Sequence, residues 1–296
     1  MSILEARDLT LRYGKTTAVD RLSVRLDGGK IYGLLGRNGS GKTSLLSVLA
    51  GFRKASGGEA LLDGDPVFEN RNATRRICLI RETGDSVDDD WPYNRVRDAL
   101  AFAGEVRPYW DPTYAAGLTD RFELSMGKRL GQLSRGQRAA LACVLGLASR
   151  APVTLFDECY LGLDAPSRYT FYDELLKDFM EHPRTIVIST HLIEEVSRLF
   201  EEVVVIHAGR LVVQEDAEEL RSRGTSVIGP AEAVDRVTSG LVVTGEKRLG
   251  PTKSAMVLGE FDGARRTAAE EAGLELGPVA LQDLFVHLTE GVGGPT

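Results

Sequence analysis

The sequence of 296 residues is poor in several features that would define its class. It has only three cysteines, Cys78, Cys143 and Cys159, and their spacing fits neither a metal site nor a disulfide framework. Positive charge is not in excess: the formal net charge is -7, which argues against sequence-independent binding to nucleic acid. No apolar run approaches the roughly 20 residues of a membrane-spanning helix, and the amino terminus lacks a signal-peptide layout. We therefore expect a soluble, cytosolic protein that reaches a membrane only through a partner.

The remaining composition is that of an ordinary globular protein, with 43% hydrophobic and 27% charged residues. Between residues 31 and 207, short apolar runs alternate with segments in which apolar residues recur at helical spacing. The expected strands lie at 31–35, 77–80, 153–157, 185–189 and 203–207, and the expected helices at 42–50, 135–149, 166–181 and 191–199. This alternation predicts an α/β core with a largely parallel sheet.

Two segments beside this core have a different texture. Residues 2–13, 22–27 and 60–62 are bounded by turn signals and are expected to be strands. Residues 85–135 are richer in Trp, Tyr, Asp, Arg and Pro, and they indicate a helical insertion with helices near 94–104 and 112–122.

Past about residue 217 a new pattern of apolar residues begins, and it predicts a small α+β unit. Its expected elements are a strand at 226–228, a helix at 231–238, strands at 241–245 and 254–260, and helices at 263–272 and 280–289. We therefore expect one domain over residues 1–217, with the helical insertion inside it, and an accessory region over residues 218–296.

A glycine-rich loop occupies residues 36–43, directly after an expected strand and at the start of an expected helix. In this context the sequence matches the phosphate-binding loop, although a chance glycine-rich turn is the alternative. Backbone N–H groups of such a loop face the phosphates, Lys42 reaches the β- and γ-phosphates, and the Thr43 hydroxyl binds Mg²⁺. The residues assigned to nucleotide binding here are Gly36, Asn38, Gly39, Ser40, Gly41, Lys42, Thr43 and Ser44.

A second chemical signal is the apolar strand at 153–157, which ends in two neighbouring acids, Asp157 and Glu158. Such a strand delivers its carboxylates to the carboxyl edge of the sheet, where ligands bind in α/β folds. Asp157 is expected to hold Mg²⁺ and Glu158 to act as general base on the attacking water. Without the loop at 36–43, a buried strand followed by a capping acid would explain the pattern equally well.

The peptide Leu-Ser-Arg-Gly-Gln at residues 133–137 opens an expected helix and precedes this acidic strand. It resembles the signature peptide Leu-Ser-Gly-Gly-Gln of the ATP-binding cassette (ABC) family, which the chain resembles over about residues 2–216. In that family the serine and the following N–H groups contact the γ-phosphate of ATP on the opposite subunit. The resemblance therefore assigns Ser134, Gly136 and Gln137 to nucleotide binding. Alone, Ser134 would be interpreted as a helix N-cap.

Three more positions match the family in the same order along the chain. Gly162-Leu163-Asp164 resembles the family's D-loop, which crosses the dimer interface. This resemblance assigns Asp164 to the nucleotide site. His191 matches the switch histidine that contacts the γ-phosphate, and Tyr13 matches the aromatic residue that stacks on adenine. In isolation, His191 would be a satisfied polar group and Tyr13 a packing residue.

Three positions depart from the family pattern. Glu82 stands where the family has the glutamine that senses the metal and the γ-phosphate, so the resemblance assigns Glu82 to catalysis and to the metal, with an altered sensing step. Arg135 replaces a signature glycine, and Cys159-Tyr160 stands where proline and a hydroxyl residue are common. Glu82, the short helical region and the ending at 279–289 resemble exporter ATPases of the drug- and antibiotic-resistance branch.

The resemblance implies a RecA-like P-loop core with an antiparallel β layer, an inserted helical subdomain and a C-terminal α+β appendage. It implies ATP and Mg²⁺ as cofactors and a second ATP-binding subunit, in a homodimer or heterodimer. It also implies a separately encoded membrane-spanning permease that holds the protein at the inner face of the cell membrane. The expected function is ATP hydrolysis that powers a membrane transporter, an exporter, through ATP-driven closure of the dimer.

Other functions remain open at this point. A regulatory nucleotide sensor with weak turnover is compatible with Glu82 and Arg135. ABC ATPases in translation usually carry two cassettes, and those in DNA repair carry a coiled-coil or zinc insertion, neither of which is present here. The acidic run at 84–90 beside Trp91 is interpreted either as a solvated loop or as a rim where the permease docks.

Overall fold

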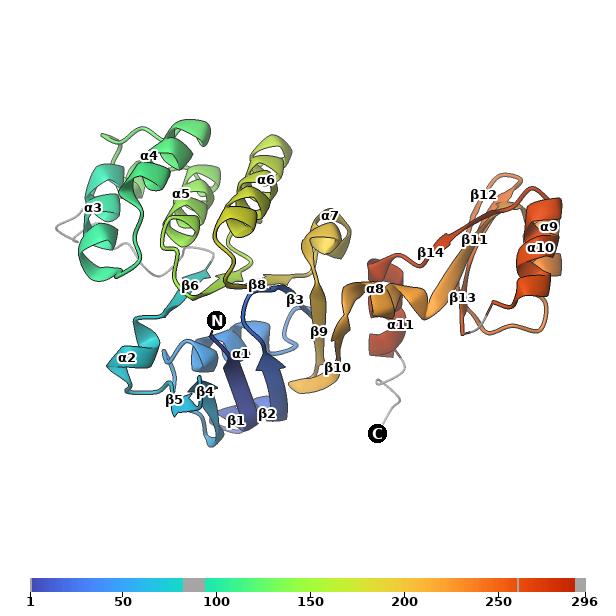
Figure 1. Ribbon diagram of the computed structural model, residues 1–296, viewed down its shortest axis with the longest axis horizontal. Coiled ribbons are helices and arrows are strands. Elements are labelled where there is room, and N and C mark those ends of the chain that lie inside the picture. Colours follow the sequence, from blue (N-terminus) through green and yellow to red (C-terminus); the bar gives the residue numbers. More distant parts are fainter. Residues whose placement is uncertain (1, 82–93, 260, 291–296) are drawn as a thin grey trace. The chain divides into compact units, whose positions relative to one another are not determined.

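The computed structural model describes residues 2–81, 94–259 and 261–290. The chain divides into two compact units (Figure 1). The first comprises Met1–His191 and Arg198–Gln214, and the second comprises Leu192–Ser197 and Glu215–Thr296. Within the described ranges, no helix has both the length and the apolar character that crossing a membrane requires.

The first unit is built on a six-stranded sheet with the strand order β10-β9-β3-β8-β7-β6. Strand β3 pairs in parallel with β8 and β9, and β7 pairs in parallel with β6 and β8. Every residue of β3, β7 and β8 is buried, as in parallel sheets that helices cover on both faces. The strands are β3 (Ile31–Leu35), β6 (Ile77–Arg81), β7 (Val153–Asp157), β8 (Thr185–Thr190), β9 (Glu202–His207) and β10 (Arg210–Asp216).

Helix α1 (Lys42–Leu49) contacts both this sheet and a second, antiparallel sheet. The second sheet has the order β2-β1-β4-β5. Its strands are β1 (Leu4–Tyr13), β2 (Thr16–Leu26), β4 (Gly57–Leu62) and β5 (Asp65–Pro66). Leu45, Leu46 and Leu49 of α1 are buried in one cluster with Leu9 of β1 and Leu155 of β7, so the apolar face of α1 joins the two sheets.

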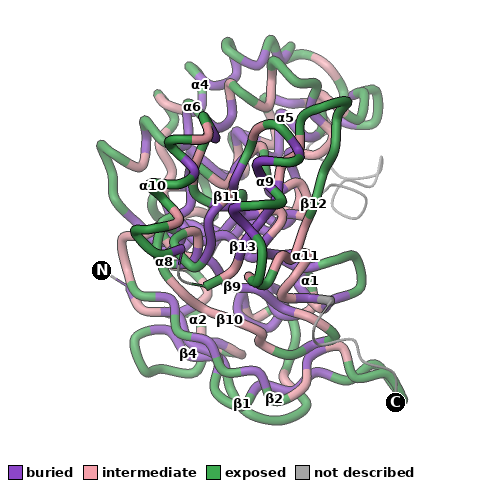
Figure 2. The backbone as a smooth tube through the Cα atoms, turned by 90° about the vertical axis from the view of Figure 1, so that its right-hand side faces the viewer, coloured by how far each residue is buried: buried purple, intermediate pink, exposed green. Residues whose placement is uncertain are grey.

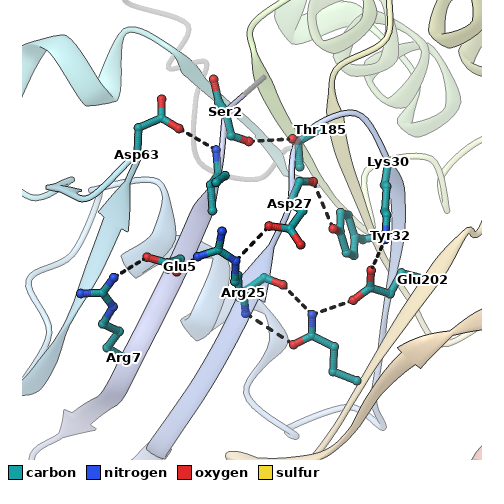
Figure 3. A network of polar contacts seen from close by, with 12 residues as sticks. Ser2, Glu5, Arg7, Arg25, Asp27, Lys30, Tyr32, Asp63, Thr185 and Glu202 are labelled. Carbon is teal, nitrogen blue, oxygen red and sulfur yellow. Dashed lines mark hydrogen bonds and ion pairs between the residues drawn. The ribbon is translucent and has the colours of Figure 1, made fainter.

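A polar network ties the antiparallel sheet to the main sheet (Figure 3). Arg25 of β2 pairs with Glu5 of β1 at 2.5 Å. The Gln214 side-chain amide donates to the Arg25 carbonyl and to the Glu202 carboxylate, and Lys30 Nζ pairs with Glu202 at 2.9 Å. Because such partly exposed pairs contribute little stability, the network mainly fixes how the two sheets meet.

The helical part of the first unit lies between β6 and β7 in the sequence. It contains α3 (Val96–Val106), α4 (Pro112–Arg121) and α5 (Arg135–Leu147), and α6 (Ala165–Glu181) follows β7. Asp111 caps α4 by accepting a hydrogen bond from Tyr114 N, and Pro112 occupies the first turn. Helix α5 contacts β6 and β7, so the signature peptide at its start is held by the sheet that bears the acids.

The second unit contains strands and helices in the order β-α-β-β-α-β. These are β11 (Gly224–Pro230), α9 (Ala231–Thr238), β12 (Val243–Leu249), β13 (Thr252–Leu258), α10 (Gly263–Glu271) and β14 (Glu275–Pro278). The sheet order β12-β13-β11-β14, with antiparallel neighbours, is the ferredoxin-like arrangement. Val227 of β11, Val234 of α9 and Val257 of β13 belong to one buried cluster, and Figure 2 shows buried stretches on these three elements. Helices α7 (Ile193–Val196), α8 (Ala217–Ser222) and α11 (Leu281–Glu290) complete the unit.

The α/β fold class expected from the sequence is confirmed, and β3, β7 and α9 have the expected bounds. The expected helix at 191–199 is shorter, because α7 covers Ile193–Val196 and a 3₁₀ turn follows it. Helices α2 (Arg71–Thr74) and α8 were not expected, since a helical period cannot show in so few residues. Strands β10 and β14 were also not expected, and β14 contains glycine and proline, which disfavour strands. The domain boundary at residue 217 stays a prediction.

Candidate active site

The candidate active site lies at the carboxyl ends of three neighbouring strands. Strands β3, β8 and β7 are adjacent and parallel, so their carboxyl ends meet at one edge of the sheet. The loop at 36–41 follows β3. Asp157 is the last residue of β7 and Glu158 comes directly after it, while His191 follows β8. The three expected motifs are thus brought together by strand order, at the position where α/β sheets bind ligands.

The loop after β3 adopts a backbone that only glycine accommodates at two positions. Gly39 and Gly41 have φ values of 80° and 106°. A Cβ on Gly41 would lie 2.4 Å from the carbonyl oxygen of Ala18. In the described structure no side chain caps α1, so the N–H groups of its first turn remain for an anion.

Lys42 is the first residue of α1, and its side chain is only 5% exposed. Its Nζ donates to the carbonyl oxygen of Gly36 at 2.7 Å and lies 3.2 Å from Glu158 Oε1. The ammonium is therefore held inside the loop, next to the position of the expected phosphates. A buried cation in such a place binds phosphate oxygens strongly because the pair is poorly screened.

Asp157 is buried and lies against two hydroxyl groups. Ser189 Oγ donates to Asp157 Oδ1 at 2.8 Å. Burial raises the pKa of Asp157, and hydrogen bonds from the Ser189 and Thr43 side chains oppose that rise. Hard oxygen donors suit Mg²⁺, which usually takes one or two protein ligands and keeps waters and substrate oxygens. Among the described residues, no group of three or more His, Cys, Asp or Glu side chains is placed to hold a metal ion.

Glu158 has a left-handed backbone, with φ of 54°, which is uncommon for a residue other than glycine. Its carboxylate oxygen Oε1 lies 3.2 Å from Lys42 Nζ and 3.2 Å from His191 Nδ1. Such local strain concentrates at functional sites, where surrounding contacts hold it. The contacts from Lys42 and His191 on either side fix the direction of this carboxylate.

The signature peptide and the D-loop lie next to each other. A Cβ on Gly136 would lie 3.3 Å from the carbonyl oxygen of Gly162, so both stretches approach closely. Ser134 caps α5 in a reciprocal pair of hydrogen bonds with Gln137, each 3.2 Å long. Asp164 caps α6, and the hydrogen bond from Ser167 lowers its pKa. Their roles toward a nucleotide on a second subunit stay predictions.

Tyr13 lies near the phosphate loop at the end of β1. Its hydroxyl is 3.4 Å from Ser44 Oγ, its ring is 40% exposed, and the Arg53 guanidinium lies 5.0 Å from the ring centre. An exposed ring beside a phosphate loop is suited to stacking on a base, although the structure does not test that role. Glu82 and the run at 84–91 lie outside the described residues.

Two residues of the site were not expected from the sequence. Ser189 donates a hydrogen bond to Asp157, and Arg81 of β6 lies opposite Asp157 of β7 in the strand register. Neither belongs to a contiguous motif, so no local pattern could have identified them. Their only signal is position, since each lies near the carboxyl end of a strand beside the acidic strand.

Comparison with known proteins agrees with this geometry. Residues 19–160 match the protein-family model described as ABC transporter. The chain is 31% identical over 219 residues to a Nod factor export ATP-binding protein I of Burkholderia lata, covering 71% of this chain and 70% of the relative. The chain belongs to the ABC transporter family. It is an ATP-binding transporter subunit, and members of this kind hydrolyse ATP.

Two further comparisons bear on the extent of this similarity. The daunorubicin resistance ATP-binding protein DrrA3 of Streptomyces coeruleorubidus is 28% identical over 297 residues, covering 94% of this chain and 93% of the relative. A solved structure titled as the ATP-binding subunit of an ABC transporter superposes with a TM-score of 0.66 at 20% identity, covering 74% of this chain and 92% of that one. The structural likeness confirms the cassette fold, and the DrrA3 alignment extends into the second unit of this ABC ATPase.

Proposed function

We propose that this ABC ATPase binds ATP with Mg²⁺ at the β3–β8–β7 edge and powers an exporter. The observation that carries the proposal is the convergence of Lys42, Asp157, Glu158 and His191 at one sheet edge. Thr43 and Asp157 are the oxygen donors that would hold Mg²⁺. When bound, the ion neutralises phosphate charge and so favours departure of the γ-phosphate.

The chain's own side chains then have distinct tasks. Lys42 exchanges its contact with Glu158 for phosphate oxygens. Glu158, once released, accepts a proton from the attacking water, and His191 keeps its carboxylate oriented. Ser189 keeps Asp157 in place through its hydrogen bond. Tyr13 offers its exposed ring to the adenine base.

The nucleotide site is completed by a second ATP-binding subunit in this proposal, either a copy of this chain or a related one. Ser134 and Gly136 lie at the start of α5, where the N–H groups and the helix dipole favour an anion. Asp164 at the start of α6 would lie at the same interface. Closure of the two subunits over ATP, and reopening after hydrolysis, would then move the membrane partner.

The membrane partner would dock on the first unit, at a groove of about 370 Å³. Phe52, Ile77, Leu79, Val106 and Tyr109 are among the residues that line it. The ring of Phe52 is 68% exposed, and a large exposed apolar side chain in a groove is typical of a protein-binding surface. A separately encoded permease bound there would hold the chain at the inner face of the membrane.

Export is the direction that the relatives favour. Two relatives that align with more than nine tenths of this chain are named for daunorubicin resistance and Nod factor export. The aligned relative named for sulfate/thiosulfate import covers 76% of this chain. The similarity to these export proteins thus extends into the second unit, whereas the solved ATP-binding subunit covers only 74% of this chain.

Inside-out membrane vesicles from cells that make this chain with its permease provide the test of transport. We expect ATP to drive accumulation of daunorubicin or another exported compound inside these vesicles, and Lys42→Ala to abolish it. ATP-driven loss of preloaded compound from the same vesicles would show import instead. Vesicles that hydrolyse ATP but show no transport in either direction across a panel of compounds would argue against the transport proposal.

A further inference from the structure

Arg81 ends strand β6 and shares a row with the acids of the site. Its Cα pairs with that of Asp157 on β7, which in turn pairs with Ser189 on β8. Residues paired across neighbouring strands point to the same face of a sheet. Arg81, Asp157 and Ser189 therefore lie in one row on the face that carries α1.

The guanidinium of Arg81 is tied to the helix that carries the phosphate loop. Arg81 Nη2 donates to Ser47 Oγ at 2.5 Å, and Ser47 Oγ donates to the carbonyl oxygen of Thr43 at 2.5 Å. Its positive charge also lowers the pKa of Asp157, against the larger effect of burial. Arg81 thus reaches the metal-binding residues both by charge and through α1.

The same guanidinium also contacts a side chain that lines the docking groove. The Arg81 guanidinium carbon lies 5.4 Å from the centre of the Phe52 ring, at a distance typical of a cation–π contact. Phe52 lines the groove with Ile77 and Leu79, which belong to the same strand as Arg81. Within the described part of the chain, Arg81 Nε is buried and has no hydrogen-bond partner, so the guanidinium keeps an unused donor.

We propose that Arg81 is a positioning residue that links the docking groove to the metal site. This inference rests on the proposed function, because it needs both a docked segment and a bound metal. A cation close to Asp157 weakens the attraction of the site for Mg²⁺. A docked segment that offers Arg81 an acceptor draws the charge away from Asp157 and tightens metal binding. By linkage, metal binding then strengthens docking by the same factor.

A charge-only explanation predicts a different result. If Arg81 merely balances the buried Asp157 charge, Phe52 has no influence on the metal. If Arg81 connects the two places, removal of the exposed Phe52 ring frees the guanidinium and changes metal affinity. The effect of Phe52 must then depend on Arg81, which a double-mutant cycle measures.

The test uses the full chain with a non-hydrolysable ATP analogue and Mn²⁺ as the metal probe, with free Mn²⁺ measured by electron paramagnetic resonance. Arg81→Gln keeps a hydrogen-bond donor for Ser47 but loses the charge, and we expect Mn²⁺ to bind roughly three- to ten-fold tighter. Arg81→Lys keeps the charge and should stay near the parent. Because the Phe52 ring holds the guanidinium by a cation–π contact, Phe52→Ala should let the charge approach Asp157, weaken Mn²⁺ binding at least two-fold in the parent, and have no effect in the Arg81→Gln background.

The matched control is Arg75→Gln, because Arg75 lines the same groove and is exposed. It should leave Mn²⁺ affinity unchanged. Equal effects of Phe52→Ala in both backgrounds, or Mn²⁺ affinity of Arg81→Gln within two-fold of the parent, would overturn the inference. If Arg81→Gln does not fold, Arg81→Met serves as the charge-free background of the same double-mutant cycle. Loss of analogue binding in the parent itself would instead count against the proposed function.

Discussion

Replacement of Glu158 by glutamine separates binding from catalysis at this site. The amide has nearly the same shape as the carboxylate but cannot accept a proton from water. Loss of a general base commonly slows a reaction by about 10²- to 10⁴-fold, which corresponds to roughly 3–5 kcal/mol of transition-state stabilisation. We therefore expect steady-state phosphate release to fall by that factor in Glu158→Gln.

The contacts of Glu158 also predict effects of opposite sign on stability and on binding. Lys42 is 5% exposed, and Glu158 Oε1 is its carboxylate neighbour at 3.2 Å. Breaking a fully buried ion pair costs about 3–5 kcal/mol, and the 22% exposure of Glu158 reduces this to about 1–2 kcal/mol here. The melting temperature without nucleotide should fall by about 2–6 °C. ATP affinity should be retained or improved, because Lys42 no longer has a carboxylate to exchange for phosphate.

The assay combines phosphate release, thermal unfolding and size-exclusion chromatography with ATP. Asp173→Asn, an exposed acid on α6, serves as the control for loss of one negative charge. The ATP-bound dimer should persist in Glu158→Gln and not in the parent. Hydrolysis that remains close to the parent rate, together with a monomer in the presence of ATP, would refute the assignment of Glu158 as the base.

Three further predictions address other parts of the account. Ser189→Ala removes a hydrogen bond that lowers the pKa of Asp157, so that pKa should rise further. Because the metal needs the charged carboxylate, the acid limb of ATPase activity should move to higher pH, and an unchanged profile would exclude this role. Tyr13→Ala should weaken ATP binding by about 1–2 kcal/mol but leave binding of inorganic triphosphate unchanged; equal weakening of both would remove the stacking role. Deletion of residues 218–296 should leave ATP affinity nearly unchanged, and its loss in a folded truncated chain would show that the domain boundary is wrong.

The fold was predictable where local pattern and tertiary role coincide. Strands such as β3 and β7 are continuous apolar runs because both of their faces are buried, so their sequences alone mark them. Helix α9 was predictable because it starts after Pro230 and keeps a clear apolar face. Strand β14 was not predictable, because its pairing with β11 and not its own residues makes it a strand.

The site follows the same division. The phosphate loop and the pair Asp157–Glu158 are contiguous and carry their geometry with them, so the sequence identifies them. The contacts of Ser189 and Arg81 arise from strand register, which a single sequence does not specify. The proximity of His191 to Glu158 likewise depends on β7 and β8 being neighbours, and only the family resemblance made His191 a candidate.

The central claim is that the loop at 36–43 binds the phosphates of ATP through Lys42. Equilibrium binding of a fluorescent ATP analogue to the purified full chain and to Lys42→Ala tests it most directly. The buried ammonium is the principal positive charge that the loop offers to phosphate. We therefore predict that Lys42→Ala binds the analogue at least ten-fold more weakly, or not at all. Its free energy of unfolding should stay within about 2 kcal/mol of the parent's. Equal affinity of the two proteins for the analogue would contradict the assignment of this loop as the ATP site.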